Sequence, residues 1–296
     1  MGLQVTGISK SYGERAAVDD LSLTVEKGQI FGFVGPNGAG KTTTMRIIVG
    51  LLDPDSGTVS WDGEAIDSGH RRQIGYMPEE RGLYPKMRVD QQLEYFGELH
   101  GMDAALARER TAEWLERLGI SERAEDNVEA LSLGNQQRVQ LAASLIFEPD
   151  ILILDEPFSG LDPIGVDVLS GVLTEVCAER DVPVIFSSHQ LELVERICDA
   201  VAIIKDGRLV ASGTVKDLER EHSENLWKAR VDGADSGWDP GLPGVTRQDA
   251  WTFRLDDGAD PQRLLESART AGPVIEFREI QPGLAELFRA SIGEQR

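Results

Sequence analysis

Short apolar stretches alternate with polar turns along the first 52 residues of the chain. Residues 3–8 and 18–25 have the length and composition of strands, and a turn lies between them around residues 12–14. Residues 30–34 are apolar throughout, which is typical of a buried strand, and they lead into a glycine-rich segment. Residues 42–52 then follow a helical pattern. This order predicts two short strands, a buried strand, a tight loop and a helix.

Between residues 89 and 129 the pattern becomes helical and polar. Leu93, Phe96 and Leu99 recur at helical spacing and form one apolar face. Strands and helices alternate again afterwards, with strands expected at 151–154, 184–187 and 201–204 and helices at 165–179 and 191–198. Such alternation predicts an α/β fold with a mostly parallel sheet covered by helices on both faces, and residues 89–129 are a helical insertion in it.

From residue 221 on, the chain has a separate character. Glycine, proline and aspartate cluster in residues 232–244, and an alternating strand follows around residues 251–255. A helix over 261–271, a strand over 274–280 and a last helix over 282–292 complete the pattern. We expect residues 1–220 to form the main domain and residues 221–296 a small α+β domain.

The charge of the chain narrows the choice of partners. Its 296 residues include 51 acidic and 30 basic side chains, which gives a net charge of −21. The excess of acid is present in both expected domains. Because such a surface repels phosphate backbones and anionic headgroups, we expect neither nucleic acid nor a bare membrane surface as the partner.

The same sequence gives no sign of a leader, a membrane span or a disulfide. The first residues lack a basic and apolar leader pattern, and the longest apolar runs are strand-sized, far short of the roughly 20 residues of a membrane helix. Cys177 and Cys198 lie among apolar residues of expected helices, so we expect buried reduced thiols. Any role at a membrane is therefore expected to be exercised from outside the bilayer.

The glycine-rich segment fits the phosphate-binding pattern G-x-x-x-x-G-K-[ST]. Glycines allow backbone N–H groups to converge on phosphate oxygens, and the helix that follows points its positive end at the same anion. Lys41 is expected to reach the β- and γ-phosphates and Thr42 to offer its hydroxyl to Mg²⁺. The segment comprises Gly35, Pro36, Asn37, Gly38, Ala39, Gly40, Lys41, Thr42 and Thr43.

Two adjacent carboxylates, Asp155 and Glu156, end the expected strand at 151–154. Taken alone, they could simply be solvated acids at a strand end. Beside a phosphate loop they suit two different tasks, because neighbouring residues at a strand end diverge. We expect Asp155 to hold Mg²⁺ and Glu156 to orient or deprotonate the attacking water.

A third segment lies upstream of this strand and precedes an expected helix. It includes Ser132, Leu133, Gly134, Asn135 and Gln136. Taken alone, it is equally consistent with a helix cap, in which Ser132 or Asn135 is the N-cap. It resembles the L-S-G-G-Q signature of ABC-type ATPases, with Leu133 in place of the first glycine and Asn135 in place of the glutamine.

The order of the remaining motifs supports the resemblance to an ABC transporter nucleotide-binding subunit, which extends over about residues 3–218. It implies a P-loop ATPase core of ABC type with an N-terminal antiparallel β part. It also implies that Tyr12 stacks on adenine, that His189 senses the γ-phosphate, and that the signature contacts ATP held by an opposite subunit. The segment of that family that crosses the dimer interface, the D-loop, corresponds to Ser159, Gly160, Leu161 and Asp162.

Glu79 departs from the family pattern, which has a glutamine here that contacts Mg²⁺ and the attacking water. A carboxylate can also ligate Mg²⁺, but it adds negative charge beside the γ-phosphate. We expect Glu79 to preserve coupling and to alter the rate or the metal preference. The candidate metal ligands are therefore Thr42, Asp155 and Glu79, and the candidate catalytic residues are Lys41, Glu156 and His189.

The partners and location follow from the resemblance alone. Residues 81–87 and the signature are similar to an exporter branch that includes sodium-ion and antibiotic efflux systems. This implies a homodimer or heterodimer of ATPase subunits, with ATP and Mg²⁺ bound, on the inner face of the cell membrane beside a polytopic permease. The surface around Leu83, Tyr84 and Met87 is expected either to hold a short permease helix or to be a local apolar cluster.

Two other classes of protein stay open from the sequence. One is an ABC-type ATPase that acts on DNA or ribosomes, which usually has two cores or a long coiled-coil insertion. The other is a regulator that binds nucleotide without hydrolysis, against which Lys41, Asp155, Glu156 and His189 argue.

Overall fold

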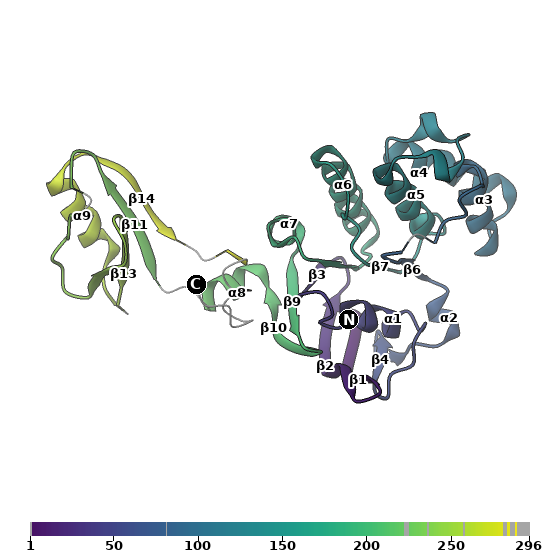
Figure 1. Ribbon diagram of the computed structural model, residues 1–296, viewed down its shortest axis with the longest axis horizontal. Coiled ribbons are helices and arrows are strands. Elements are labelled where there is room, and N and C mark those ends of the chain that lie inside the picture. The colour runs from purple at the N-terminus through teal and green to yellow at the C-terminus, as the bar shows by residue number, and fades with distance from the viewer. Residues whose placement is uncertain are drawn as a thin grey trace. The chain divides into compact units, whose positions relative to one another are not determined.

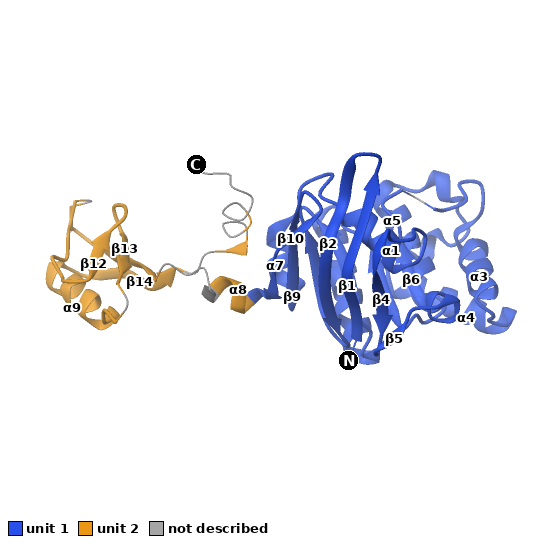
Figure 2. Ribbon diagram, turned by 90° about the horizontal axis from the view of Figure 1, so that it is seen from below, with its two compact units in different colours: residues 1–215 blue, residues 216–296 orange. Residues whose placement is uncertain are grey.

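A computed structural model of the chain describes residues 2–80, 82–221, 225–235, 237–256, 258–280, 283, 284 and 288. The chain divides into two compact units, residues 1–215 and 216–296, which are coloured separately in Figure 2. The division falls at residue 215 rather than at residue 220, and helix α8 (Val215–Glu221) begins at it.

Unit 1 begins with an antiparallel sheet in the order β2-β1-β4-β5 (Figure 2). Its strands are β1 (Gly2–Tyr12), β2 (Arg15–Glu26), β4 (Ser56–Trp61) and β5 (Glu64–Ala65). Leu21, Leu23 and Val25 alternate with exposed residues along β2, so this strand buries one face and leaves the other to solvent.

A six-stranded sheet in the order β10-β9-β3-β8-β7-β6 forms the centre of unit 1. Five of its strands run parallel, and β10 is antiparallel to β9 at one edge. Strands β3, β7 and β8 are buried along their whole length, which explains the apolar sequences of β3 and β7 and of the first three residues of β8. The strands are β3 (Ile30–Val34), β6 (Ile74–Met77), β7 (Ile151–Leu154), β8 (Val184–Ser188), β9 (Ala200–Lys205) and β10 (Arg208–Thr214).

The main core lies between the two sheets and includes helix α1 (Lys41–Ile48). Met45 and Ile48 of this helix pack with Leu3 and Ile8 of β1 and with side chains of the central strands. The opposite face of the central sheet is covered by α5 (Leu133–Leu145), α6 (Pro163–Arg180) and α7 (Leu191–Ile197), as Figure 1 shows. The central sheet is therefore shielded on both faces.

The helical insertion consists of α3 (Val89–Leu99) and α4 (Ala104–Arg117), which pack with α5 (Figure 1). Asp103 caps α4, since its carboxylate accepts hydrogen bonds from the N–H groups of Ala105 and Leu106. Two short 3₁₀ turns, Ser121–Arg123 and Val128–Ala130, lead on to α5. A four-residue helix α2 (Ser68–Arg71) lies before β6.

Unit 2 contains a four-stranded antiparallel sheet in the order β12-β13-β11-β14. Helix α9 packs on it, and its Leu264 joins Ala229, Phe253 and Leu255 in a small core. Apart from α8, the elements are β11 (Leu226–Val231), β12 (Val245–Arg247), β13 (Thr252–Leu255), α9 (Pro261–Ala271) and β14 (Val274–Ile280).

The predicted α/β class with a mostly parallel sheet, an antiparallel β part and a helical insertion is confirmed. Helix α1 was predicted to reach residue 52 but ends at Ile48, because Gly50 with φ of +74° stops it. Strands β4, β5, β6, β10, β11 and β12 were not predicted. The helix expected over 282–292 falls mainly outside the described residues.

Two smaller expectations concern the cysteines and the membrane. Cys177 and Cys198 are free and buried, and burial raises the pKa of the Cys177 thiol to about 11, so it stays protonated at neutral pH. Within the described part of the chain, no helix has both the length and the apolar character needed to cross a membrane.

The close contact between β6 and α5 gives a test of this packing. A Cβ at Gly75 would lie 2.4 Å from the carbonyl oxygen of Ser144. We expect Gly75→Ala to lower the free energy of unfolding by about 1–3 kcal/mol, as overpacking of a core does. Urea denaturation of the whole chain, followed by circular dichroism, measures this change.

The matched control is Gly171→Ala in the exposed face of α6, where an added Cβ meets nothing within 4 Å. It should raise the free energy of unfolding by about 0.5–1 kcal/mol, because alanine favours the helix. Equal effects of the two substitutions would contradict the close packing of β6 on α5.

Candidate functional site

The glycine-rich loop joins β3 to α1, and its shape depends on glycine. Gly40 has φ of +107°, and a Cβ there would lie 2.3 Å from the carbonyl oxygen of Ala17. Among the residues that the structure describes, no side chain caps the first N–H groups of α1. These N–H groups and the positive end of the helix dipole therefore remain available to an anion.

Lys41 lies at the centre of the site. It is 7% exposed, and its Nζ donates a hydrogen bond to the carbonyl oxygen of Gly35 at 2.7 Å. Burial lowers the pKa of this amino group, and the carboxylates of Glu156, Asp155 and Glu79 oppose that shift. Nζ also lies 3.9 Å from Oε1 of Glu156. The phosphate loop and the carboxylate pair thus face each other across one ammonium group.

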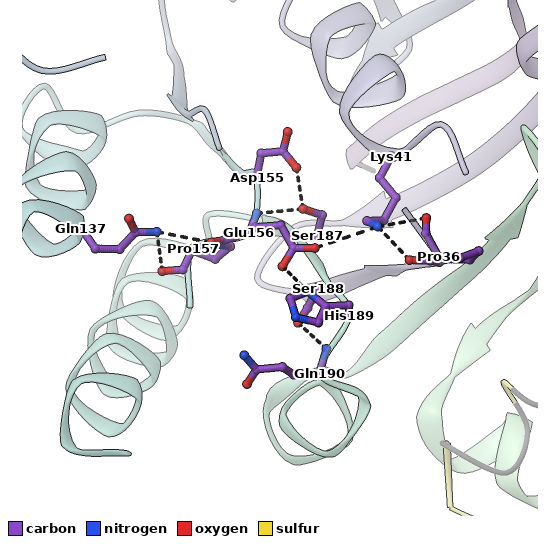
Figure 3. A network of polar contacts seen from close by, with 11 residues as sticks. Pro36, Lys41, Gln137, Asp155, Glu156, Pro157, Ser187, Ser188, His189 and Gln190 are labelled. Carbon is purple, nitrogen blue, oxygen red and sulfur yellow. Dashed lines mark hydrogen bonds and ion pairs between the residues drawn. The ribbon is translucent and has the colours of Figure 1, made fainter. Parts of the chain in front are cut away.

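Asp155 and Glu156 follow β7 and diverge as predicted (Figure 3). Asp155 is fully buried, and its Oδ1 accepts a hydrogen bond from Ser187 Oγ at 2.6 Å. The same Oγ accepts from the Glu156 N–H at 2.8 Å. Ser187 therefore fixes both neighbours at once.

His189 lies beside the second carboxylate. Its Nδ1 is 2.9 Å from Oε2 of Glu156, as Figure 3 shows, and its side chain is 57% exposed. The Glu156 side chain is 11% exposed. A partly buried carboxylate next to an imidazole and an ammonium group is a suitable site for proton transfer to or from water.

One cleft of about 520 Å³ collects most of the predicted ATP-binding residues. Tyr12 lies at its margin, 56% exposed. Arg15 also lines it, and its guanidinium lies 3.5 Å from the position that a Cβ of Gly38 would take. Arg15 was not predicted from the sequence. The predicted residues in the lining are Tyr12, Asn37, Gly38, Gly40, Lys41, Thr42, Thr43, Glu79, Asp155 and Glu156.

The residues of this cleft fit a cation as well as phosphate. Asp155 Oδ2 is buried and has no hydrogen-bond partner among the residues that the structure describes. A buried polar oxygen without a partner is costly inside a protein, and a carboxylate oxygen is the kind of ligand that hard divalent cations take, directly or through water. Thr42 and Glu79 line the same cleft.

The signature and D-loop residues are absent from the described lining of the cleft. Ser132 is the N-cap of α5 and accepts from the Asn135 N–H at 3.4 Å, and Leu133 is 57% exposed. Asp162 caps α6 through the Gly165 N–H. The signature therefore lies at the start of α5, and the D-loop ends at the start of α6. The exposed side chain of Leu133 is accessible to another molecule.

Gln137 connects the signature helix to the carboxylates. Its Nε2 donates to the carbonyl oxygens of Pro157 at 2.8 Å and Glu156 at 3.3 Å, as drawn in Figure 3. No role of Gln137 was predicted from the sequence. Its side chain is 7% exposed, so the link is shielded from water.

Comparison with known proteins agrees with this geometry. A family model described as ABC transporter matches residues 18–159. The chain is 43% identical over 218 residues to an uncharacterized ABC transporter ATP-binding protein, YhaQ, of Bacillus subtilis (strain 168), across 74% of this chain and 73% of that protein. It is 38% identical over 219 residues to the linearmycin resistance ATP-binding protein LnrL of the same organism, across 73% and 70%.

A solved structure of the ATP binding subunit of an ABC transporter is also similar. It has a TM-score of 0.69 and 31% sequence identity, and the match covers 75% of this chain and 93% of that chain. The fold thus agrees with that of a solved ABC transporter ATP-binding subunit. The chain belongs to the ABC transporter ATP-binding proteins, and it is an ATP-hydrolysing subunit that powers transport through a separate membrane component.

Proposed function

We propose that the cleft binds ATP with the adenine on Tyr12 and the phosphates on residues 35–43. The convergence of Lys41, Asp155, Glu156 and His189 beside the glycine loop is the observation that carries this assignment. Lys41 exchanges its bond to the Gly35 carbonyl for the β- and γ-phosphates. The uncapped N–H groups of α1 bind the same phosphate oxygens.

Thr42 and Asp155 hold Mg²⁺ together with the phosphates, and Glu79 is a third ligand. The unpaired Oδ2 of Asp155 supports this role. When bound, Mg²⁺ neutralises charge on the phosphate oxygens. Ser187 keeps the other oxygen of Asp155 in place, so the carboxylate presents Oδ2 in a fixed direction.

Glu156 is the base that orients or deprotonates the attacking water, and His189 contacts the γ-phosphate. The bond between the two side chains at 2.9 Å supports a shared task, because movement of the imidazole toward phosphate releases the carboxylate. Lys41 stabilises negative charge as it develops on the γ-phosphate.

Two ATPase subunits, identical or related, enclose ATP between them. Ser132, Leu133, Gly134, Asn135 and Gln136 of one subunit contact the ATP of the other, and residues 159–162 cross the interface. The exposure of Leu133 and the position of the signature outside its own cleft support this arrangement. Closure of the pair excludes water and completes the site.

A second hollow, which we call the groove, is the docking site for a short cytoplasmic helix of the permease. It has a volume of about 250 Å³. Tyr84, which is 52% exposed, stacks against Phe96 beside it. An aromatic and apolar surface of this kind suits an amphipathic helix. Its lining includes Ile74, Tyr76, Leu83, Phe96, His100 and Phe147.

The transported compounds are ions or drug-like molecules, and the direction is efflux. The name of the relative LnrL, a linearmycin resistance ATP-binding protein, supports this direction. The chain then lies on the inner face of the cell membrane, attached through the permease. Residues 1–220 are the motor domain and residues 221–296 an accessory domain.

Glu156→Gln tests the assignment of the base. The variant should bind ATP and form dimers, while its hydrolysis falls by about 10²–10⁴-fold, because proton transfer to the base is lost. Phosphate release at saturating ATP measures the rate. Turnover near the wild-type rate would remove Glu156 as the base.

The same variant tests the transport assignment when it is purified in mild detergent from the membranes that contain its own permease. A polytopic membrane protein should accompany it, and more strongly with ATP than without. If ribosomal or DNA-repair proteins accompany it instead, with no membrane protein, the ATPase assignment stands and the transport assignment falls.

Ser187→Ala tests the support of the metal ligand. Removing a hydrogen bond to a buried carboxylate should raise the Mg²⁺ concentration for half-maximal ATPase activity by about tenfold. Ser188→Ala is the matched control, because Ser188 Oγ accepts only from the Gln190 N–H among the contacts of this network. A Mg²⁺ requirement that stays the same in both variants would exclude a supporting role for Ser187.

Glu79→Gln tests the departure from the family pattern. Loss of one negative charge beside the phosphates should tighten ATP binding without Mg²⁺ and raise the Mg²⁺ concentration needed for activity, each by about fivefold. Nucleotide titrations and activity at varied Mg²⁺ and Mn²⁺ measure both changes. If the rate, the metal dependence and transport were all unaltered, Glu79 would be only a solvated side chain.

A further inference from the structure

The backbone of Glu156 is held by hydrogen bonds on both sides of its Cα. Its N–H donates to Ser187 Oγ at 2.8 Å, and its carbonyl oxygen accepts from Gln137 Nε2 at 3.3 Å (Figure 3). The same carbonyl oxygen accepts from the Ser159 N–H at 3.1 Å. The φ of Glu156 is +51°, in the left-handed region that disfavours residues with a side chain. Such a conformation persists only where the surrounding structure holds it, and these three bonds do so.

Gln137 reaches this backbone from α5, a separate element. Its side chain is 7% exposed, and Nε2 also donates to the carbonyl oxygen of Pro157 at 2.8 Å. An amide nitrogen has two N–H groups, so one side chain can bond to two successive carbonyl oxygens. The amide of Gln137 therefore fixes the direction in which the chain leaves Glu156.

We propose that Gln137 is a positioning residue for Glu156, whose left-handed backbone conformation it maintains. The inference rests on the proposed role of Glu156 as the base. In this conformation the carboxylate of Glu156 lies 2.9 Å from His189 Nδ1 and 3.9 Å from Lys41 Nζ. Because the side chain leaves from the same Cα, a rotation of the backbone to negative φ would move the carboxylate away from both groups.

This role requires a hydrogen-bond donor at position 137 and not only a side chain of suitable size. A leucine there would fill the volume without a donor. An ionised glutamate would present oxygen atoms to carbonyl oxygens, whereas a protonated glutamate would restore one O–H donor. Burial raises the pKa of a carboxyl group, so a glutamate at this position would gain its proton as the pH falls toward neutral and below. The pH dependence of that variant therefore distinguishes positioning from packing.

The experiment uses the full isolated chain and compares wild type, Gln137→Leu, Gln137→Glu and Gln92→Leu. Gln92→Leu is the matched control, because Gln92 is a fully buried glutamine of α3 whose amide bonds to the N–H and the carbonyl oxygen of Tyr84. Gln92 is absent from the described lining of the ATP cleft. Phosphate release at varied ATP gives kcat and KM, and nucleotide titration gives the Kd for ATP. Thermal denaturation verifies that each variant is folded.

We expect Gln137→Leu to lower kcat by about tenfold, the loss that corresponds to one hydrogen bond at a buried acceptor. The KM and the Kd for ATP should be unaltered, because the bonds of Gln137 go to the segment after β7 and not to the phosphate loop. Gln92→Leu should retain the wild-type kcat.

For Gln137→Glu we expect a rate, relative to wild type, that is low at alkaline pH and rises as the pH falls. The donor is present below the raised pKa of the new carboxyl group and is lost as the pH rises through it. Wild type is measured at every pH, because Asp155, Glu156, His189 and Lys41 also titrate in or beside the cleft. The ratio of the two rates removes their contribution.

Two results would overturn the inference while the proposed function stands. One is a wild-type kcat in Gln137→Leu, or a loss that Gln92→Leu shares. The other is a rate ratio of Gln137→Glu that is the same at every pH, and this measurement decides alone if Gln137→Leu does not fold. If Glu156→Gln itself retains turnover, the assignment of the base fails instead.

Discussion

The ATP cleft depends on the hydrogen-bonded ladder of three parallel strands, β3, β8 and β7, which lie side by side in the central sheet. The carboxyl ends of neighbouring parallel strands lie at the same edge of the sheet, so the segments that follow these strands lie close together. The phosphate loop follows β3, the carboxylate pair follows β7, and His189 follows β8. Residues that are more than 100 positions apart in the sequence, such as Lys41 and Glu156, therefore come within one ion-pair distance.

Burial gives these groups their chemical character. The side chains of Asp155 and Lys41 are buried, and each forms a short hydrogen bond with a neighbouring residue. In such surroundings a charge interacts more strongly than in water, and an unpaired group costs more. In the proposed function, phosphate and a cation supply the remaining partners of these buried groups. Ser187 of β8 accepts a hydrogen bond from the Glu156 N–H, and Gln137 of α5 donates one to the Pro157 carbonyl oxygen. These two bonds connect the segment after β7 to β8 and to α5.

The sequence predicts the parts of this site that consist of continuous motifs. The glycine loop, the acids after β7 and the histidine after β8 have fixed spacing and a clear strand context, so their neighbourhood follows from the topology of the sheet. Ser187 and Gln137 are different, because their roles depend on which backbone or carboxylate atom faces them in space. Arg15 is recognisable only from its place in the lining of the cleft. A polar residue at the end of an apolar strand next to β7 is the one signal that would have singled out Ser187.

The same limit applies to the fold. Long buried strands and capped helices are recognisable in the sequence, and α9 and β14 have the predicted bounds. The strands β4 and β10 mix apolar and polar residues without a clean alternation, since their side chains are partly buried or exposed. Their pairing is decided by tertiary contacts that a local pattern does not contain.

The backbone of Glu156 has φ of +51°, a left-handed conformation that residues other than glycine rarely adopt. The bond from its N–H to Ser187 helps to hold this conformation. A glycine would fit the backbone with less strain, yet it would provide no carboxylate. The chain thus gives up some conformational stability at this point to place a carboxylate beside Lys41 and His189, and selection for thermostability alone would move the position away from glutamate.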